Sequence, residues 1–224
     1  MRESLTLVAL ILVAPHFCSG QLCGQSYNAR IAQIHEVAQQ LDGQKPRIVL
    51  TGSSSIRKWP QTDTVFAHFD VVNAGFGGSC FSDLWRLRDT LIYALRPNVL
   101  VVYEGDNDLS DGVPSEDILA VADQLLEEVS RRLPDIDIVV IAPKASRARS
   151  HLASAYLSLN KKLRVVAMNH GAHWVDFWGV QHNARGELRD ELFIHDKLHL
   201  NAEGYAVWVN ELRRQLPWLE PNAK

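Results

Sequence analysis

Four short stretches of the chain combine residue types that can do chemistry together. The first, at 52–55, sets three serines after a glycine, and the second, at 73–78, reads NAGFGG. The third, at 105–108, places an asparagine among aspartates, and the fourth, at 196–199, reads DKLH. A hydroxyl, backbone N–H donors, a side-chain amide and an acid–base pair are the parts with which a protein attacks a carbonyl carbon.

The fourth stretch contains a candidate acid–base pair. A serine hydroxyl is a poor nucleophile until a base within hydrogen-bond reach takes its proton. His199 is the candidate base, because histidine accepts and returns protons near neutral pH. Asp196 is close enough in sequence to bond the other ring nitrogen and stabilise the imidazolium. His195 is adjacent, and His195, Asp196 and His199 are all metal-ligand types, so a metal site is the alternative interpretation.

The four stretches are tied to short apolar runs that predict buried strands. These runs lie at 47–52, 71–76, 98–105, 137–143 and 172–178. They are continuous rather than alternating, as strands buried on both faces are. Helical patterns separate the runs, and this alternation indicates right-handed βαβ units in a parallel sheet. Ligands bind at the carboxyl ends of such strands, so we expect the four stretches to meet there.

Helix boundaries are marked by individual residues. Pro97 and Pro134 are expected to end two helices, because proline cannot continue one. Ser115 and Asn201 are expected to cap the starts of two helices, and Gly171 to cap the end of another. These helices would position the strands rather than contribute chemistry.

In order and content, the four stretches resemble the sequence blocks of SGNH, or GDSL-type, hydrolases, a superfamily of esterases and acylhydrolases. The resemblance runs from about Arg47 to Trp218. The first block usually reads Gly-Asp-Ser, whereas GSSSIRKW here is similar to a branch that includes the platelet-activating-factor acetylhydrolases. The resemblance implies a three-layer α/β/α sandwich with a five-stranded parallel sheet of flavodoxin-like order. It also implies a single domain, which would occupy 21–224.

The resemblance assigns roles to particular residues. Ser54 occupies the nucleophile position, Ser53 replaces the usual aspartate, and Ser55 begins the following helix. Asp196 and His199 complete the implied catalytic triad. The resemblance implies no cofactor and no metal.

The resemblance also implies an oxyanion hole. Its donors would be the backbone N–H groups of Ser54 and Gly78 and the side-chain amide of Asn107. Each such donor can contribute roughly 3 kcal/mol to the transition state. Taken alone, the glycines at 77–78 favour a plain turn, and Asn107 favours an Asx-turn.

Several residues near these stretches receive no catalytic role. We expect Arg57 to pair with a loop and Trp59 to pack in the core, rather than either contacting substrate. Glu104 stands where relatives in this branch carry a small residue, which makes it a candidate for tuning substrate choice. Other polar residues near strand ends are Asp106, Asp108 and Arg147.

Composition excludes some classes of function. The chain has 224 residues, of which 46% are hydrophobic, and its formal net charge is −3. This length and apolar content suit one domain with a substantial core. A nucleic-acid-binding protein would carry a basic excess, so we expect no nucleic-acid partner.

The N-terminus has the pattern of a cleavable signal peptide. A basic residue precedes an apolar run from Leu5 to Ala14, which is shorter than the roughly 18 residues that a membrane-spanning helix needs. We predict a signal peptide at 1–20, secretion or export to the periplasm, and no stable membrane insertion afterwards. A membrane anchor is the alternative. Cys23 and Cys80 would remain, either as a disulfide or as two free thiols.

The sequence thus predicts a serine esterase or acylhydrolase that cleaves carboxylic esters through an acyl-Ser54 intermediate. The substrate would be a small-molecule, glycan or lipid ester, for instance a short-chain or acetyl ester. Thioesterases and acyltransferases use the same parts, and neither the substrate nor the oligomeric state can be deduced from the sequence. The alternative is a non-catalytic module that binds an anion or a carbohydrate, with backbone N–H groups of the helix that follows 52–55 holding an anion.

Overall fold

The computed structural model describes residues 24–219, so the predicted signal peptide at 1–20 lies outside the described residues. Five strands form one parallel sheet in the order β2-β1-β3-β4-β5. They are β1 (Arg47–Gly52), β2 (Asp70–Asn73), β3 (Val99–Tyr103), β4 (Asp137–Ile141) and β5 (His173–Val175). This order is the predicted flavodoxin-like one, so the predicted fold class is confirmed.

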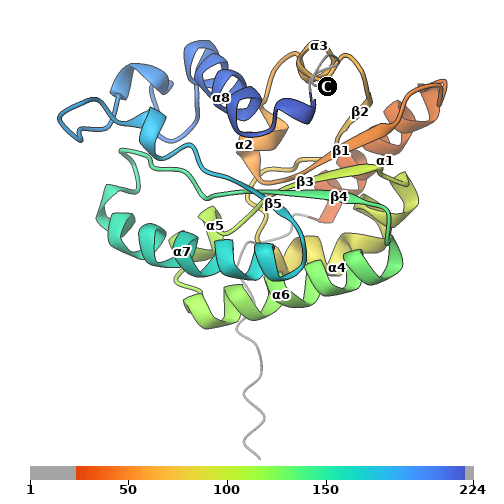
Figure 1. The fold of residues 1–224 in the computed structure, drawn as a ribbon, viewed down its shortest axis with the longest axis horizontal. Coiled ribbons are helices and arrows are strands. Elements are labelled where there is room, and N and C mark those ends of the chain that lie inside the picture. The colour runs from red at the N-terminus through yellow and green to blue at the C-terminus, as the bar shows by residue number, and fades with distance from the viewer. Residues whose placement is uncertain (1–23, 220–224) are drawn as a thin grey trace, which may run out of the picture.

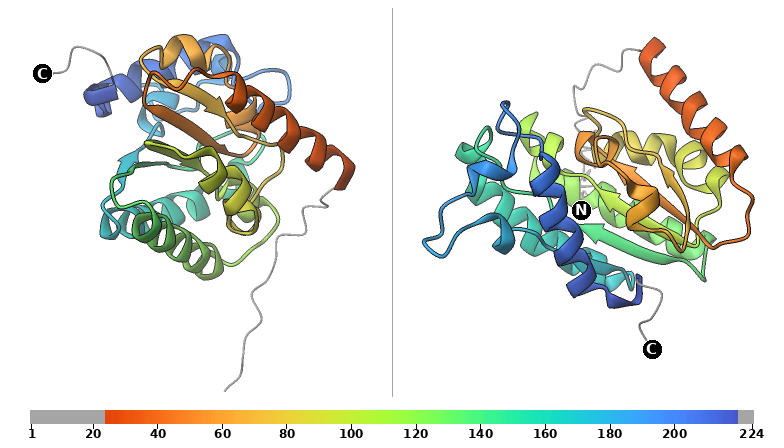
Figure 2. Two further views of the ribbon diagram at one scale, coloured as in Figure 1. Left: turned by 90° about the vertical axis from the view of Figure 1, so that its right-hand side faces the viewer. Right: turned by 90° about the horizontal axis from the view of Figure 1, so that it is seen from above.

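Helices cover both faces of the sheet, as Figures 1 and 2 show. One face carries α4 (Phe81–Leu91), α6 (Ser115–Arg132) and α7 (Ala153–Asn169), with α1 (Gly24–Gln40) beside β2. The other face carries α2 (Ser54–Arg57) and α8 (Ala202–Gln215). The remaining short helices are α3 (Thr62–Val65), α5 (Asp106–Ser110), η1 (Tyr93–Leu95), η2 (Ser150–Leu152), η3 (Gly179–Gln181), η4 (Asp190–Leu192) and η5 (Pro217–Leu219).

The central strand β3 explains why the apolar runs are continuous. All five of its residues are buried. Successive side chains of a strand point to opposite faces, and accordingly Leu100 and Val102 join one hydrophobic cluster while Val99 and Val101 join the other. Each face therefore has its own core, and a strand between two cores has no polar position along its length.

Helix boundaries follow the predicted signals except at Ser115 and at Ser55, which is the second residue of α2 rather than its first. The Asn201 side chain caps α8 by accepting the N–H of Gly204 at 3.0 Å, and Gly171 follows α7 with a φ of 71°. Ser115 is not a cap as predicted, because it is the first residue of α6 and the cap position belongs to Pro114. Helix α1 was not anticipated from the sequence.

A glycine at the end of β1 is required by its surroundings. Gly52 has a φ of 137°, and a Cβ there would lie 2.2 Å from the carbonyl oxygen of Tyr103. Any side chain would therefore push β1 away from β3 at the point where the chain turns into α2. The close approach of Gly52 to β3 therefore sets the position at which the three serines leave the strand.

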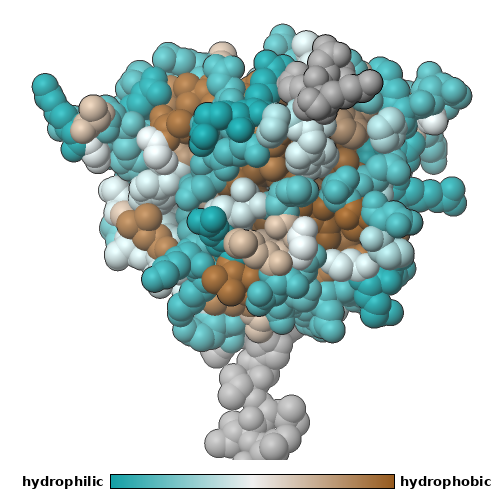
Figure 3. All heavy atoms as spheres, in the orientation of Figure 1, coloured by the Kyte–Doolittle hydropathy of each residue, from teal (hydrophilic) through white to brown (hydrophobic). Residues whose placement is uncertain are grey.

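Hydrophilic side chains cover most of the face in Figure 3. No helix within residues 24–219 combines the length and the apolar character needed to cross a bilayer. Cys80 is disulfide-bonded, whereas Cys23, with which it was considered either to pair or to remain a free thiol, lies outside the described residues.

Candidate active site

The three serines differ in what surrounds them. Ser53 and Ser55 are buried, whereas Ser54 is partly exposed. The Ser53 backbone N–H donates to Tyr103 at 3.2 Å, and the Ser55 carbonyl accepts the hydroxyl of Tyr205 at 2.8 Å. The Ser54 Oγ lies 2.8 Å from the Nε2 of His199. Of the three hydroxyls, the structure therefore brings that of Ser54 to the predicted base.

Asp196 holds the imidazole from its other side. Its Oδ2 lies 2.6 Å from the His199 Nδ1, and its Oδ1 accepts the backbone N–H groups of Leu198 and His199, each at 2.9 Å. Burial acts to raise the pKa of Asp196, but the hydrogen bonds from the His199 ring and from both backbone groups outweigh it. The pKa of this carboxyl is thereby held well below its usual range. A carboxylate that stays ionised fixes the ring tautomer and stabilises an imidazolium.

The sheet order places the candidate oxyanion donors on either side of Ser54. β1 lies between β2 and β3, so Ser54 follows the middle strand, while Gly78 and Asn107 follow its two neighbours. Within the described part of the chain, the backbone N–H groups of Ser54 and Gly78 have no protein acceptor. Both groups are therefore free to bind an oxygen atom.

Asn107 is hydrogen-bonded to Ser79, the residue that follows Gly78 in the chain. Gly78 has a φ of 80° with open space where a Cβ would be, so glycine is favoured there by the backbone conformation rather than by close packing. The Asn107 Nδ2 donates one hydrogen to the carbonyl of Ser79 at 2.9 Å. Its second amide hydrogen remains for another acceptor.

Asp106 lies inside the protein and has partners of its own. It accepts the Tyr103 hydroxyl at 2.8 Å and the Lys144 ammonium at 3.3 Å, and it also contacts the Tyr156 hydroxyl and the Arg149 guanidinium. Burial would raise the pKa of Asp106, but the two positive charges and the hydroxyl groups outweigh it and hold this pKa well below its usual range. The Asp106 carboxylate is thus an internal anchor, in keeping with its lack of a predicted catalytic role.

Glu104 does not face substrate, contrary to what its position in the sequence suggested. It is fully buried, and its Oε1 lies 2.6 Å from the Ser79 hydroxyl. Burial, with the nearby charge of Asp108, raises the pKa of Glu104 well above its ordinary value. A neutral carboxyl group that braces Ser79 from inside cannot select substrates by contact.

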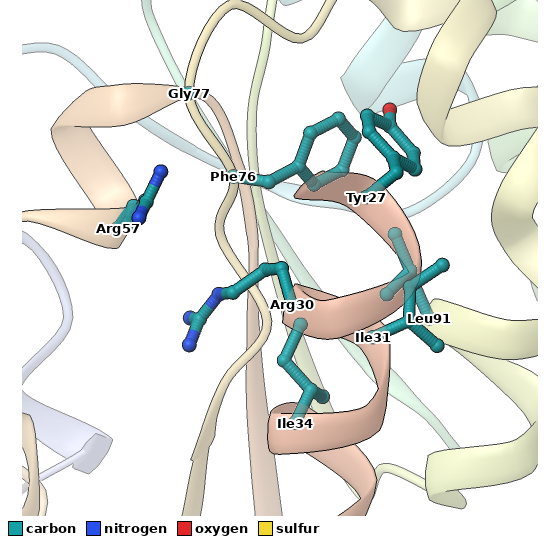
Figure 4. A pocket seen from close by; sticks show the side chains of 8 residues that line it. All are labelled: Tyr27, Arg30, Ile31, Ile34, Arg57, Phe76, Gly77 and Leu91. Carbon is teal, nitrogen blue, oxygen red and sulfur yellow. The ribbon is translucent and has the colours of Figure 1, made fainter. Parts of the chain in front are cut away.

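Arg57 and Trp59 also have distinct surroundings. Trp59 lies just beyond the end of α2 and packs in the core against Phe66 and Trp208, as predicted. Arg57 is exposed and lines a cavity of about 40 Å³ together with Arg30 and other residues (Figure 4). No hydrogen bond joins its guanidinium to a loop within the described residues, so the predicted loop pairing is not seen there.

Sequence reasoning missed Arg30, which forms hydrogen bonds with the end of β2 and with the loop that follows it. Its guanidinium donates to the carbonyl oxygens of Gly75 at 3.0 Å and Asn73 at 2.7 Å. Figure 4 shows the side chain extending from α1 toward this loop. The hydrophobic positions of α1 that pack on the core could have revealed this helix in the sequence, and with it the place of Arg30.

The alternative for the fourth stretch is a metal site made of His195, Asp196 and His199. His195 is exposed, and the His199 ring bonds Ser54 and Asp196 through its two nitrogens. Among residues 24–219, no group of three or more His, Cys, Asp or Glu side chains is arranged to hold a metal ion.

A model of the GDSL-like lipase/acylhydrolase family matches residues 51–207, which is more than half of the chain and contains Ser54, Asp196 and His199. The chain belongs to the GDSL-like lipase/acylhydrolase family. It is therefore related to hydrolases that cleave esters, and the resemblance seen in the sequence is confirmed.

Relatives and solved structures agree with this membership. The platelet-activating factor acetylhydrolase IB subunit alpha1 of Homo sapiens is 25% identical over 179 residues, covering 76% of this chain and 75% of the relative. A GDSL-like lipase from Bacteroides thetaiotaomicron superposes with a TM-score of 0.70 at 16% identity, over 87% of this chain and 98% of that one. An acetyl xylan esterase from Geobacillus stearothermophilus superposes with a TM-score of 0.65 at 15% identity, over 76% and 94%. The two structural matches show the shared fold.

The buried Glu104 generates a test of stability against pH. Folding raises the pKa of Glu104. The protonated side chain therefore adds to the free energy of unfolding in full below about pH 4, the pKa of an unfolded glutamate, and this addition is lost as the pH rises through the folded-state pKa. Glu104→Gln keeps a neutral partner for Ser79. We expect the variant to lie within about 1 kcal/mol of the parent protein at pH 5 and to become the more stable protein as the pH rises to 9.

Urea unfolding at several pH values measures this difference, with the exposed Glu127→Gln as the matched control. A large loss of stability in Glu104→Gln that does not vary with pH would show that the ionised carboxylate is the form that the fold requires.

Proposed function

We propose that this protein is a serine esterase that cleaves carboxylic esters through an acyl-Ser54 intermediate. The observation that carries the proposal is the continuous hydrogen-bonded chain from the Ser54 Oγ through both nitrogens of His199 to the Asp196 carboxylate, with contacts of 2.8 and 2.6 Å. Membership in a lipase and acylhydrolase family supports this chemistry.

The first half of the reaction forms the acyl-enzyme. His199 takes the hydroxyl proton as the Ser54 oxygen attacks the ester carbonyl carbon. The carbonyl oxygen becomes an oxyanion, which accepts hydrogen bonds from the N–H groups of Ser54 and Gly78 and from the Asn107 amide. Collapse of this intermediate breaks the bond to the alcohol oxygen, and the imidazolium returns its proton to that leaving group.

The second half of the reaction frees the serine. His199 takes a proton from water, and the resulting hydroxide attacks the acyl carbon. The second tetrahedral intermediate uses the same three donors. Its collapse releases the carboxylic acid and returns the proton to the Ser54 oxygen. Asp196 stays ionised throughout and stabilises each imidazolium, which its depressed pKa supports.

For the substrate we propose a short-chain ester, with an acetyl group on a sugar or lipid as the leading candidate. The acetylhydrolase and acetyl xylan esterase names of similar proteins support this choice. A panel of 4-nitrophenyl esters of increasing acyl length, together with acetylated xylan, tests it. Fastest turnover of a long-chain ester would contradict the proposal.

Substitution of Ser54 tests its assignment as the nucleophile. Ser54→Ala should lower kcat by at least about 1000-fold on 4-nitrophenyl acetate, because it removes the attacking oxygen. Ser53→Ala and Ser55→Ala are matched controls that change the two neighbouring hydroxyls, and both should retain substantial activity.

Steady-state kinetics and a melting curve on the same samples decide this point. Near-parental turnover by a folded Ser54→Ala would overturn the assignment. A parent protein that hydrolyses none of the esters in the panel would instead favour the non-catalytic binding module.

We also propose that the protein works outside the cytoplasm, in the periplasm or the medium. The predicted signal peptide supports this, as does the disulfide at Cys80, since disulfides persist in oxidising compartments. N-terminal sequencing of the exported protein should then begin at Gln21. An N-terminus at Met1 in a membrane fraction would favour the anchor.

A further inference from the structure

The Asn107 side chain is held between two partners of opposite kind. Arg149 donates from Nη2 to the Asn107 Oδ1 at 2.9 Å, while the Asn107 Nδ2 donates to the carbonyl of Ser79 at 2.9 Å. A guanidinium can only donate hydrogen bonds, and a carbonyl oxygen can only accept them. These two partners therefore fix which end of the amide carries the N–H groups.

The guanidinium of Arg149 is itself held in place. Its Nη1 donates to the backbone carbonyl of Asp106 at 2.9 Å and also contacts the Asp106 carboxylate. The Arg149 side chain is 14% exposed, against 51% for Arg147 in the same loop. Arg149 thus spans Asp106 and Asn107, and its charge is shielded from water by the fold.

We infer that Arg149 is a positioning residue, which orients and polarises the Asn107 amide so that its free N–H binds the oxyanion. This inference rests on the proposed function. A positive charge beside the amide oxygen draws electron density away from Nδ2, which strengthens the remaining N–H as a donor. A donor that is aligned beforehand also needs no reorganisation when charge develops.

Among residues 24–219, Arg149 is the one residue that donates a hydrogen bond to the Asn107 Oδ1. Without Arg149, the amide would keep its bond to Ser79, but its Oδ1 would lose the donor that opposes rotation. The arginine charge also persists at every pH at which enzymes work. Lysine could replace it only in part, because an ammonium lacks the planar fork that reaches Asp106 and Asn107 together.

The test is a double-mutant cycle on kcat with 4-nitrophenyl acetate. Asn107→Ala should lower kcat by about 100- to 1000-fold with little change in KM, as loss of an oxyanion donor does. Arg149→Met should lower kcat by about 10- to 100-fold, again with KM nearly unchanged. In the Asn107→Ala background, Arg149→Met should cost less than about threefold, because its target is gone.

Two further variants separate positioning from structure. Arg147→Met removes an exposed arginine of the same loop and should leave kcat unchanged. Arg149→Lys should recover part of the activity. Melting curves on all variants show whether a loss of activity follows a loss of folding, and equal fold-losses from Arg149→Met in both backgrounds would overturn the inference.

A readout that needs no activity distinguishes this inference from the proposed function. In an ¹⁵N-labelled sample, the Asn107 side-chain amide signals are identified by their disappearance in Asn107→Ala. We expect them to be sharp in the parent protein and Arg147→Met, and shifted or broadened in Arg149→Met. Unchanged signals in Arg149→Met would refute the inference, whatever the activity. Changed signals in a protein that hydrolyses no ester would refute the proposed function while leaving the orienting role of Arg149 supported.

Discussion

The contact between the Ser54 hydroxyl and the His199 imidazole is the interaction on which the site depends. It joins residues 145 positions apart across 2.8 Å. Ser54 is placed by the end of β1, and His199 by a loop that precedes α8. The hydroxyl of Tyr205 in α8 donates to the Ser55 carbonyl, which ties that helix to the start of α2. Because all the strands of the sheet are parallel, their carboxyl ends share one edge, and the contact can form there.

Polar groups buried beneath this edge position the candidate oxyanion donors. The Ser79 carbonyl accepts a hydrogen bond from the Asn107 amide, and the Ser79 hydroxyl is hydrogen-bonded to Glu104. Arg149 donates hydrogen bonds both to the Asn107 side chain and to the backbone carbonyl of Asp106. Such groups are costly to bury unless each is paired, so the network restricts the arrangement of the loops that follow β2 and β3. The geometry of the candidate site therefore depends on buried polar groups as well as on hydrophobic packing.

Much of this could be predicted from the sequence, because the signals are local. Continuous apolar runs mark strands buried on both faces, and the first three polar stretches lie at the ends of β1, β2 and β3, while the fourth lies in the loop before α8. The roles of Arg149 and Glu104 could not be predicted, because they depend on burial. Arg147 and Arg149 are two residues apart and look alike in sequence, yet one reaches Asn107 and the other pairs with Asp190 at the surface. Glu104 likewise resembles a site residue in the sequence, whereas in the structure its side chain is buried.

The central claim is that, of the chain's hydroxyl groups, the one on Ser54 is activated for attack. Its most direct test is reaction of the folded parent protein with a fluorophosphonate, followed by peptide mapping of the adduct by mass spectrometry. We expect one adduct per chain, on Ser54, that no longer forms after the protein is denatured. An adduct on Ser53, Ser55 or any other residue, or no adduct on a protein that hydrolyses esters, would contradict it.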